Sequence, residues 1–270
     1  MYAFNYHRPE SLAQAAELFG STDDPVYVAG GHTMIPTLKL RLASPSDVID
    51  LAGVSELVGI RVDAAGEARG GAKLVVGALT PHAHVAASRE VNETIPALAT
   101  LAGGIGDPQV RNRGTLGGSV ANADPAADYP AAVLGLAATI ATDQREIEGD
   151  AFFTGMFETA LEPGEIITQI SFAVPEKAAY CKFPNPASRY ATVGVMVSVT
   201  GGNVRVGVTG AAPAPFRSTA LEEALTADLS IDAIDGVAID YDGFNTDLHA
   251  SAEYRGHLVG VMAKRAVQAL

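Results

Sequence analysis

The sequence predicts an α+β protein, with a two-lobed domain followed by a smaller α+β domain. Three observations lead to this fold class. Short apolar strands alternate with helical stretches up to about residue 175, an antiparallel hairpin pattern follows, and two glycine-bearing loops border ordered segments of the first part. The 270 residues suffice for two modest domains with cores of their own. We expect lobes at about 1–53 and 54–175, and a second domain over 176–270.

The first lobe is expected to be a small α/β unit. Residues 4–9 are extended, and Ser11 can cap a helix that ends near Gly20. A short strand over 26–28 leads into the first glycine loop. A helix over 35–42 follows, is stopped by Ser44-Pro45, and gives way to a strand over 47–51. This order places the glycine loop at a strand-to-helix junction, where backbone amides and the helix dipole favour an anion.

The second lobe begins with strands over 57–62 and 73–78, joined by a polar connection that contains glycine. Thr80 is the expected N-cap of the next helix, with Pro81 in its first turn. A helix over 95–101 should end in a left-handed cap at Gly103-Gly104. An alanine-rich buried helix over 133–138, a strand over 138–142, an apolar segment over 152–157 and an alternating strand over 166–172 complete the lobe.

The C-terminal domain starts with a hairpin. Residues 193–200 and 204–209 are apolar runs joined by a turn at Gly201-Gly202-Asn203. A short helix over 220–225 and a polar, aspartate-rich stretch over 228–247 follow. A final helix from about Ser251 carries Leu258, Val261, Met262 and Val267 on its apolar side.

Composition excludes several classes of function. The 18 Lys and Arg residues against 31 Asp and Glu residues give a net charge of −13, which opposes non-specific nucleic-acid binding. The longest apolar runs fall short of about 18 residues, so no transmembrane helix is expected. The N-terminus lacks a basic region followed by an apolar segment, and a cytoplasmic location is therefore the expectation.

Cysteine and histidine usage argues against metal chemistry in this chain. The single cysteine, Cys181, excludes an internal disulfide framework and a cysteine-ligated iron–sulfur cluster. Cys181 is better explained as a small apolar filler than as a catalytic thiol. The six histidines form no recognised metal pattern. His82 and His84 would not share a helix face, so we expect surface or capping histidines.

Two glycine-bearing loops are the strongest candidates for a binding site. The first covers 28–36 and the second covers 111–119, with a continuation over 121–128. Glycine lets backbone N–H groups come close to a ligand, and successive N–H groups form an anion site. Neither loop matches the Rossmann fingerprint or a Walker loop. The residues alone therefore indicate either a two-sided diphosphate cradle or two ordinary turns.

Ala29-Gly30-Gly31-His32-Thr33 and Thr115-Leu116-Gly117-Gly118 resemble the paired flavin motifs of the FAD-binding medium subunits of molybdenum hydroxylases. This family includes the carbon monoxide dehydrogenase medium chain and the flavin part of xanthine dehydrogenase. Its usual motifs are A-G-G-H-S and T-I-G-G, so Thr33 and Leu116 depart conservatively. Segments 111–128, 207–217 and 251–255 also resemble the family, in the same order, and the resemblance covers nearly the whole chain.

The resemblance implies a fold and a set of domains. Residues 1–175 would form a two-lobed FAD-binding domain of the vanillyl-alcohol-oxidase or PCMH type. Residues 176–270 would resemble the C-terminal domain of the carbon monoxide dehydrogenase flavoprotein. No catalytic residue is implied in this chain, because the motif position of His32 belongs to the cofactor loop and not to a base.

The resemblance also implies the FAD-binding residues. The first loop would wrap the diphosphate with Ala29, Gly30, Gly31, His32, Thr33 and Met34, and the second lobe would close on it with Thr115, Gly117, Gly118 and Ser119. Asp128 matches a family aspartate that contacts the cofactor, since a carboxylate can accept from sugar hydroxyls. Asn122 and Asp124 either join it or simply form the turn around Pro125.

Five further residues are implied near the flavin ring. Ile105 resembles an apolar neighbour of the flavin, and Ile166 or Ile167 would pack on the ring, unless both are plain core residues. Lys182 resembles a lysine that stabilises negative charge on the reduced ring, with surface solvation as the alternative. Tyr190 lies where related chains can place an aromatic residue over the isoalloxazine, with an ordinary core tyrosine as the alternative.

The implied function is an electron relay. A molybdenum cofactor in a large partner subunit oxidises the substrate, and two [2Fe-2S] clusters in a small subunit carry electrons to FAD in this chain. An external acceptor then receives them, and the family expectation is an (αβγ)2 heterohexamer. The alternatives are a self-contained flavin oxidoreductase with its own substrate pocket and a non-catalytic nucleotide-binding regulatory protein. The substrate and the acceptor stay open.

Overall fold

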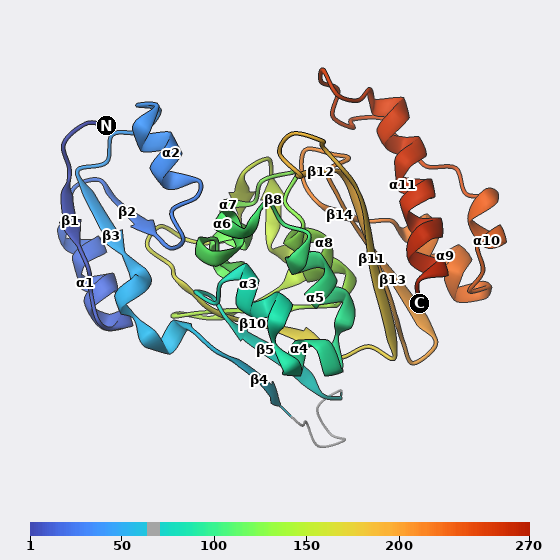
Figure 1. Cartoon of the computed structure of the whole chain (residues 1–270), viewed down its shortest axis with the longest axis horizontal. Coiled ribbons are helices and arrows are strands. Elements are labelled where there is room, and N and C mark those ends of the chain that lie inside the picture. Colours follow the sequence, from blue (N-terminus) through green and yellow to red (C-terminus); the bar gives the residue numbers. More distant parts are fainter. Residues whose placement is uncertain (64–70) are drawn as a thin grey trace.

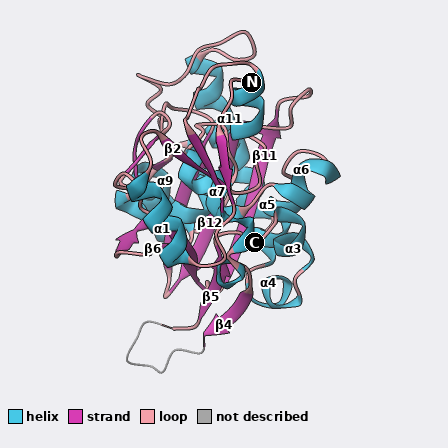
Figure 2. Cartoon of the chain, turned by 90° about the vertical axis from the view of Figure 1, so that its left-hand side faces the viewer, coloured by secondary structure: helices cyan, strands magenta, loops and turns pink. Residues whose placement is uncertain are grey.

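The computed structural model describes residues 1–63 and 71–270 and arranges them as three bodies side by side (Figure 1). A first lobe lies on the left, a central lobe follows, and the C-terminal sheet with its helices lies on the right. Figure 2, which looks from the side of the first lobe, shows helices and strands mixed through the molecule. The predicted α+β class is confirmed. Within the described residues, no helix is long and apolar enough to cross a membrane.

The first lobe is a three-stranded parallel sheet with two helices. Its elements are β1 (Asn5–His7), α1 (Leu12–Ser21), β2 (Pro25–Val28), α2 (Met34–Lys39) and β3 (Asp47–Asp50), with strand order β1-β3-β2. The Ser11 side chain caps α1, as predicted. The segment 4–9, expected to be extended, contains a strand, because β1 pairs with β3 and sets Tyr6 opposite Val48. The predicted second helix ends early, since Arg41 has a φ of 60°, which a helix cannot continue.

The central lobe contains a five-stranded antiparallel sheet. Its strands are β4 (Ile60–Asp63), β5 (Lys73–Gly77), β6 (Thr139–Thr142), β7 (Glu146–Glu148) and β10 (Ile167–Ala173), in the order β4-β5-β10-β6-β7, and β8 (Phe153–Gly155) and β9 (Glu158–Thr159) form a separate hairpin. The first strand starts later than predicted, because 55–57 is a 3-10 turn that buries Leu57. The predicted polar connection falls largely on residues 64–70, outside the described residues.

Six helices of the central lobe correct the sequence expectations most. They are α3 (His82–Ala87), α4 (Arg89–Thr94), α5 (Pro96–Gly103), α6 (Pro108–Arg113), α7 (Leu116–Asn122) and α8 (Tyr129–Gly135). Pro81, not Thr80, is the N-cap of α3, while the Thr80 hydroxyl bonds to Gly59. Gly104 ends α5 with a φ of −84°, so the predicted left-handed cap is wrong. The predicted helix over 133–138 starts earlier, at Tyr129, and ends at Gly135.

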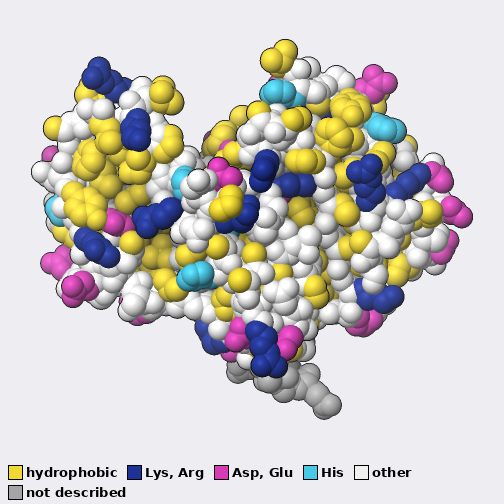
Figure 3. Space-filling view, viewed as in Figure 1, with side chains coloured by type: hydrophobic (Ala, Val, Ile, Leu, Met, Phe, Trp, Pro, Cys, Tyr) yellow, Lys and Arg dark blue, Asp and Glu magenta, His cyan; other side chains and the backbone are white. Residues whose placement is uncertain are grey.

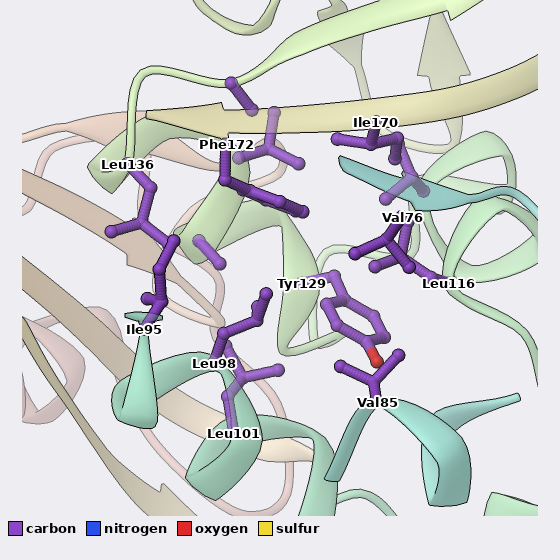
Figure 4. Packing of buried hydrophobic residues seen from close by; sticks show 14 of the residues in the cluster. Val76, Val85, Ile95, Leu98, Leu101, Leu116, Tyr129, Leu136, Ile170 and Phe172 are labelled. Carbon is purple, nitrogen blue, oxygen red and sulfur yellow. The ribbon is translucent and has the colours of Figure 1, made fainter. Parts of the chain in front are cut away.

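The core of the central lobe lies between its sheet and these helices (Figure 4). Tyr129 lies among Val85, Leu98 and Leu116, and all four side chains are fully buried. The apolar segment expected over 152–157 is split, because Phe152 is fully buried while Phe157 is 56% exposed.

The C-terminal sheet is buried on both faces. Its elements are β11 (Lys177–Pro184), β12 (Ala191–Thr200), β13 (Asn203–Thr209), β14 (Phe216–Arg217), α9 (Thr219–Ala227), α10 (Asp232–Asp235) and α11 (Ala252–Gln268), with strand order β11-β12-β13-β14. The predicted hairpin is confirmed, and Gly201 and Gly202 have φ values of 58° and 77° at its turn. Val193, Val195 and Val197 face α9 and α11, while Met196 packs with the central core beside α8. This double cover explains the continuous apolar run of β12.

Close packing of β13 on α8 requires glycine at residue 207. A Cβ atom there would lie 2.2 Å from the Ala131 carbonyl oxygen. We therefore expect Gly207→Ala to lower the free energy of unfolding by about 1 to 3 kcal/mol, the cost typical of overpacking. Urea unfolding of the whole chain measures the change.

Gly20→Ala is the matched control, since a Cβ at Gly20 meets no atom within 4 Å and the residue lies in α1. This change should raise the free energy of unfolding by up to about 1 kcal/mol. An unfolding midpoint of Gly207→Ala equal to that of the parent chain would contradict the close contact.

Candidate functional site

A cleft of about 530 Å³ opens where the first lobe, the central lobe and the 185–190 loop of the C-terminal domain meet. The hollow between the left-hand lobe and the rest of the molecule is visible in Figure 3. Every residue of the predicted cofactor site lines this cleft except Lys182. The lining members are Ala29, Gly30, Gly31, His32, Thr33, Met34, Ile105, Thr115, Gly117, Gly118, Ser119, Asn122, Asp124, Asp128, Ile166, Ile167 and Tyr190.

The first-lobe loop presents a row of free hydrogen-bond donors. Within the described residues, none of the N–H groups of residues 30–34 donates to a protein acceptor. Gly31 supplies the turn with a φ of 75°, a conformation that side chains other than glycine rarely adopt. A Cβ on Gly30 would lie 2.1 Å from the Arg113 carbonyl oxygen, so glycine also lets this loop touch the central lobe. Such a row of amides is an anion-binding surface.

The second glycine segment is built differently, because most of its backbone amides already have protein acceptors. The segment is the first turn of α7, with the Thr115 side chain as its cap. The N–H groups of Leu116 and Gly117 donate to the Thr80 and Ala78 carbonyls at 3.1 and 2.8 Å. Those of Gly118 and Ser119 donate to Thr115 itself.

The glycines of this segment serve packing. A Cβ on Gly117 would lie 2.5 Å from that of Ala78, and one on Gly118 would lie 3.4 Å from that of Ala29 across the cleft. What the segment can offer a ligand are side chains. The Ser119 hydroxyl and the Asn122 amide have no protein partner among the described residues.

Two carboxylates lie at one end of the cleft. Asp124 accepts the Ala126 N–H at 2.8 Å, which forms the expected turn, and burial raises the pKa of this carboxyl. Asp128 is only 4% exposed and accepts the Tyr180 hydroxyl at 2.6 Å and the Lys182 ammonium at 2.9 Å. Burial raises the pKa of Asp128, and the Lys182 charge opposes that rise. A carboxylate has about four acceptor positions, so Asp128 can still accept from a ligand.

Two further predicted residues, Lys182 and Tyr190, now have a definite place. Lys182 lies behind the cleft wall with a side chain 12% exposed, so neither surface solvation nor a direct place in the cleft describes it. Tyr190 is 45% exposed and lines the cleft, which excludes an ordinary core tyrosine. Burial raises the pKa of its hydroxyl, and the charge of Asp124 adds to the rise.

Residues 2–176 match the family model of the FAD binding domain in molybdopterin dehydrogenase, and residues 178–270 match that of the CO dehydrogenase flavoprotein C-terminal domain. The chain is 34% identical to the carbon monoxide dehydrogenase medium chain of Hydrogenophaga pseudoflava, over 98% of this chain and 96% of the relative. The chain belongs to the FAD-binding medium subunits of molybdenum hydroxylases.

Two further comparisons agree with this family. The medium chain of glyceraldehyde dehydrogenase from Sulfolobus acidocaldarius is 32% identical over 97% of this chain and 96% of the relative. Reconstituted CO dehydrogenase from Oligotropha carboxidovorans contains a chain that superimposes with a TM-score of 0.88 at 33% identity, over 98% of this chain and 96% of that one. This medium subunit is therefore an oxidoreductase component with an FAD-binding domain.

The cleft of this medium subunit contains a histidine that sequence reasoning misplaced. His82 is 4% exposed, so the expectation of a surface or capping histidine is wrong for it. Its Nδ1 atom has no partner in the described structure, and its ring centroid lies 5.3 Å from that of Tyr129, whose hydroxyl is also unpaired. The helical spacing could have predicted this burial, because His82 is three residues before the buried Val85 and so lies on the same helix face.

Glu165, at the turn before β10, is a second cleft residue that the sequence did not reveal. Its carboxylate accepts two hydrogen bonds from the Arg145 guanidinium at 2.9 and 3.0 Å and one from the Thr142 hydroxyl at 2.7 Å. The Arg145 guanidinium lowers the pKa of Glu165 to about 2. Glu165 thus fixes the chain just before Ile166 and Ile167, which line the cleft, and its carboxylate is occupied by these bonds.

Stability at mildly acid pH should depend on His82. Burial lowers the pKa of His82 to about 4, from 6.5. The folded state therefore resists protonation while the unfolded chain accepts a proton, and folding stability is lost as pH falls from 6.5 towards 4. We expect His82→Leu to remove about 2 to 3 kcal/mol of this pH-dependent loss.

The measurement is urea unfolding of the parent chain and of His82→Leu at several pH values between 7 and 4, with the difference between the two taken at each pH. His84→Leu is the control, since His84 is exposed on the same helix. A difference between His82→Leu and the parent that does not change with pH would contradict the buried neutral imidazole.

Proposed function

We propose that this chain is the FAD-carrying electron-transfer subunit of a molybdenum hydroxylase, and that FAD binds in the cleft between its lobes. One observation carries the proposal. The N–H groups of residues 30–34 have no acceptor among the described residues, and their loop lines the same cleft as residues 115, 117, 118 and 119 of the second lobe. Unpaired backbone donors side by side are costly unless a ligand or water satisfies them, and a diphosphate suits them.

The rest of the cleft fits the other parts of FAD. Its volume of about 530 Å³ falls in the range of small-molecule and cofactor sites. Asn122, Asp124 and Asp128 offer polar groups for sugar and ribityl hydroxyls, whereas Ile105, Ile166 and Ile167 offer apolar surface for a ring system. Tyr190 borders the same space with an aromatic face. The first lobe thus supplies amide donors, and the second supplies side chains.

The protein's own residues bind and orient the cofactor. Amides of the first loop hold negative oxygens, the Ser119 hydroxyl adds a donor from the other side, and the apolar residues exclude water from the ring. When bound, FAD supplies the redox chemistry, taking electrons from [2Fe-2S] clusters of a small partner subunit and releasing them to an external acceptor. We assign no catalytic residue to this chain.

The domain assignment is part of the same proposal. We assign residues 1–175 to the FAD-binding domain, with lobes over about 1–53 and 54–175, and residues 176–270 to the C-terminal domain. The family-model matches over 2–176 and 178–270 support these limits. The separate apolar cluster of β12 and β13 with α9 and α11 supports them too.

Partner subunits complete the proposed reaction. Cys181 is the single cysteine, and iron–sulfur clusters need several thiolates, which supports clusters on another chain. A large subunit would hold the molybdenum cofactor, and two copies of each subunit would form the complex, in the cytoplasm. The relatives' names refer to carbon monoxide and to glyceraldehyde, which supports a choice of substrate made outside this chain.

Affinity purification of the tagged native protein tests the assembly. We expect two companion chains, flavin absorption bands, and iron and molybdenum in the eluate. The decisive measurements are the absorption spectrum and metal analysis of that eluate. Flavin without companion chains, combined with reduction by a small substrate, would contradict the relay and favour a self-contained flavin oxidoreductase.

Gly30→Ala tests the cleft itself. The added Cβ would meet the Arg113 carbonyl at 2.1 Å and force the two lobes apart. We expect the Kd for FAD to rise by about tenfold or more, equivalent to at least about 1.4 kcal/mol. Flavin content after dialysis of the holo-complex against graded FAD gives the Kd.

Gly103→Ala provides the control, because a Cβ there meets only that of Ala86, at 3.8 Å, in the same domain. Equal flavin affinity in Gly30→Ala and in this control would place FAD elsewhere.

A further inference from the structure

Lys182 is the predicted site residue that the cleft does not contain, and its contacts explain why. An ammonium group has three N–H donors. The Lys182 Nζ atom meets three protein acceptors, namely the Asp128 carboxylate at 2.9 Å, the Gly104 carbonyl at 2.9 Å and the Arg189 carbonyl at 2.8 Å. No donor is left for a ligand in the cleft.

These three acceptors belong to three segments that are distant in sequence. Gly104 follows α5, Asp128 precedes α8, and Arg189 lies in the 185–190 loop between β11 and β12. One buried charge therefore joins the end of one helix, the start of another and a loop of the C-terminal domain. Tyr180 strengthens the junction from the same strand, since its hydroxyl donates to Asp128 at 2.6 Å.

Arg189 joins the loop to the 104–106 turn a second time, and Arg111 of α6 holds the same turn. Arg189 donates from its guanidinium to the Gly106 carbonyl at 3.0 Å. Arg111 donates to the carbonyls of Ile105 and Gly106 at 2.9 and 3.0 Å. The two joined segments carry Ile105 and Tyr190, which line the same cleft.

The loop contains one residue with an unusual backbone conformation. Arg189 has a φ of 63°, in the left-handed region that non-glycine residues rarely occupy. Its carbonyl is the group that Lys182 holds. Local bonds also support the loop, because the Asn185 side chain accepts the N–H groups of Ala187 and Ser188 and the Asn185 carbonyl accepts that of Arg189 at 2.9 Å.

We propose that Lys182 is a positioning residue of the cleft, which holds the 185–190 loop against the 104–106 turn so that Tyr190 and Ile105 form one wall around the flavin. The proposal rests on FAD as the occupant of the cleft. It replaces a direct contact between the Lys182 charge and the flavin with an action through Asp128, Gly104 and Arg189.

Hydrogen exchange followed by mass spectrometry tests, without any cofactor, whether Lys182 holds the 185–190 loop against the 104–106 turn. In the full chain, Lys182→Met should make amides of 104–107 and 187–190 exchange about tenfold faster, while those of 193–199 and 204–209 stay as in the parent. Lys177→Met is the matched control, since Lys177 is an exposed lysine on the same strand. Parent-like exchange in both segments of Lys182→Met would overturn the proposal.

A double variant separates the effect of losing the Lys182 contacts from the effect of leaving the Asp128 charge unpaired. Removing one partner of a buried pair leaves the other unpaired, which destabilises by itself. Lys182→Met with Asp128→Asn removes both charges. We expect it to recover thermal stability relative to Lys182→Met but to keep the fast exchange of 187–190. Recovery of slow exchange in the double variant would overturn the proposal.

Emission from bound flavin gives the second readout, because an aromatic ring stacked on a flavin quenches it. At equal FAD content, Lys182→Met and Tyr190→Leu should both raise the emission several-fold over that of Lys177→Met. Unchanged emission together with a lowered midpoint potential in Lys182→Met would show a direct charge contact and sink the proposal. Failure of the parent chain to bind FAD would refute the proposed function alone, since hydrogen exchange still decides the role of Lys182.

Discussion

The contact between the first lobe and the central lobe at Gly30 is the constraint on which the cleft depends. A Cβ atom added to Gly30 would lie 2.1 Å from the Arg113 carbonyl oxygen. A Cβ atom added to Gly118 would likewise come within 3.4 Å of that of Ala29. Glycine at these places lets two backbones approach each other without intervening side chains. The lobes thereby touch beside the cleft, while the amides of residues 30–34 have no acceptor in the described part of the chain. A side chain at this contact would separate the donors from the opposite wall.

The two glycine motifs, which look alike in sequence, have different physical roles. In the first, the backbone is free to bind, because it lies in a turn between β2 and α2. In the second, the backbone is committed to the start of α7 and to the carbonyls of Ala78 and Thr80, and its glycines permit tight packing. On that side of the cleft, the Ser119 hydroxyl and the Asn122 amide are the groups without a protein partner among the described residues.

The C-terminal domain forms part of the cleft wall and also holds other cleft residues in position. Its sheet packs on α8 through Gly207 on one face and on α11 through valines on the other. Thr209 and Ala191 bond to the carbonyls of Pro125, Ala127 and Ala126, so the acidic end of the cleft is held by β12 and β13. Arg255 of α11 binds the carbonyls of Thr192 and Gly210 behind it. The relative position of Asp124, Asp128 and Tyr190 thus depends on the contact between the two domains.

The sequence by itself determined the fold class, the family, the hairpin at Gly201-Gly202 and all but one of the predicted residues around the cleft. These features depend on local signals, namely periodicity, turn residues and motifs whose spacing is short. Tertiary structure alone decided where the amides of α7 bond, that His82 is buried, and that Lys182 is turned away from the cleft towards Asp128. The physical reason is that each of these depends on contacts with residues between 36 and 78 positions away, whose identity only the folded chain reveals. Two of the three acceptors of Lys182 lie 54 and 78 residues before it, and the residues next to Lys182 in its strand do not indicate them.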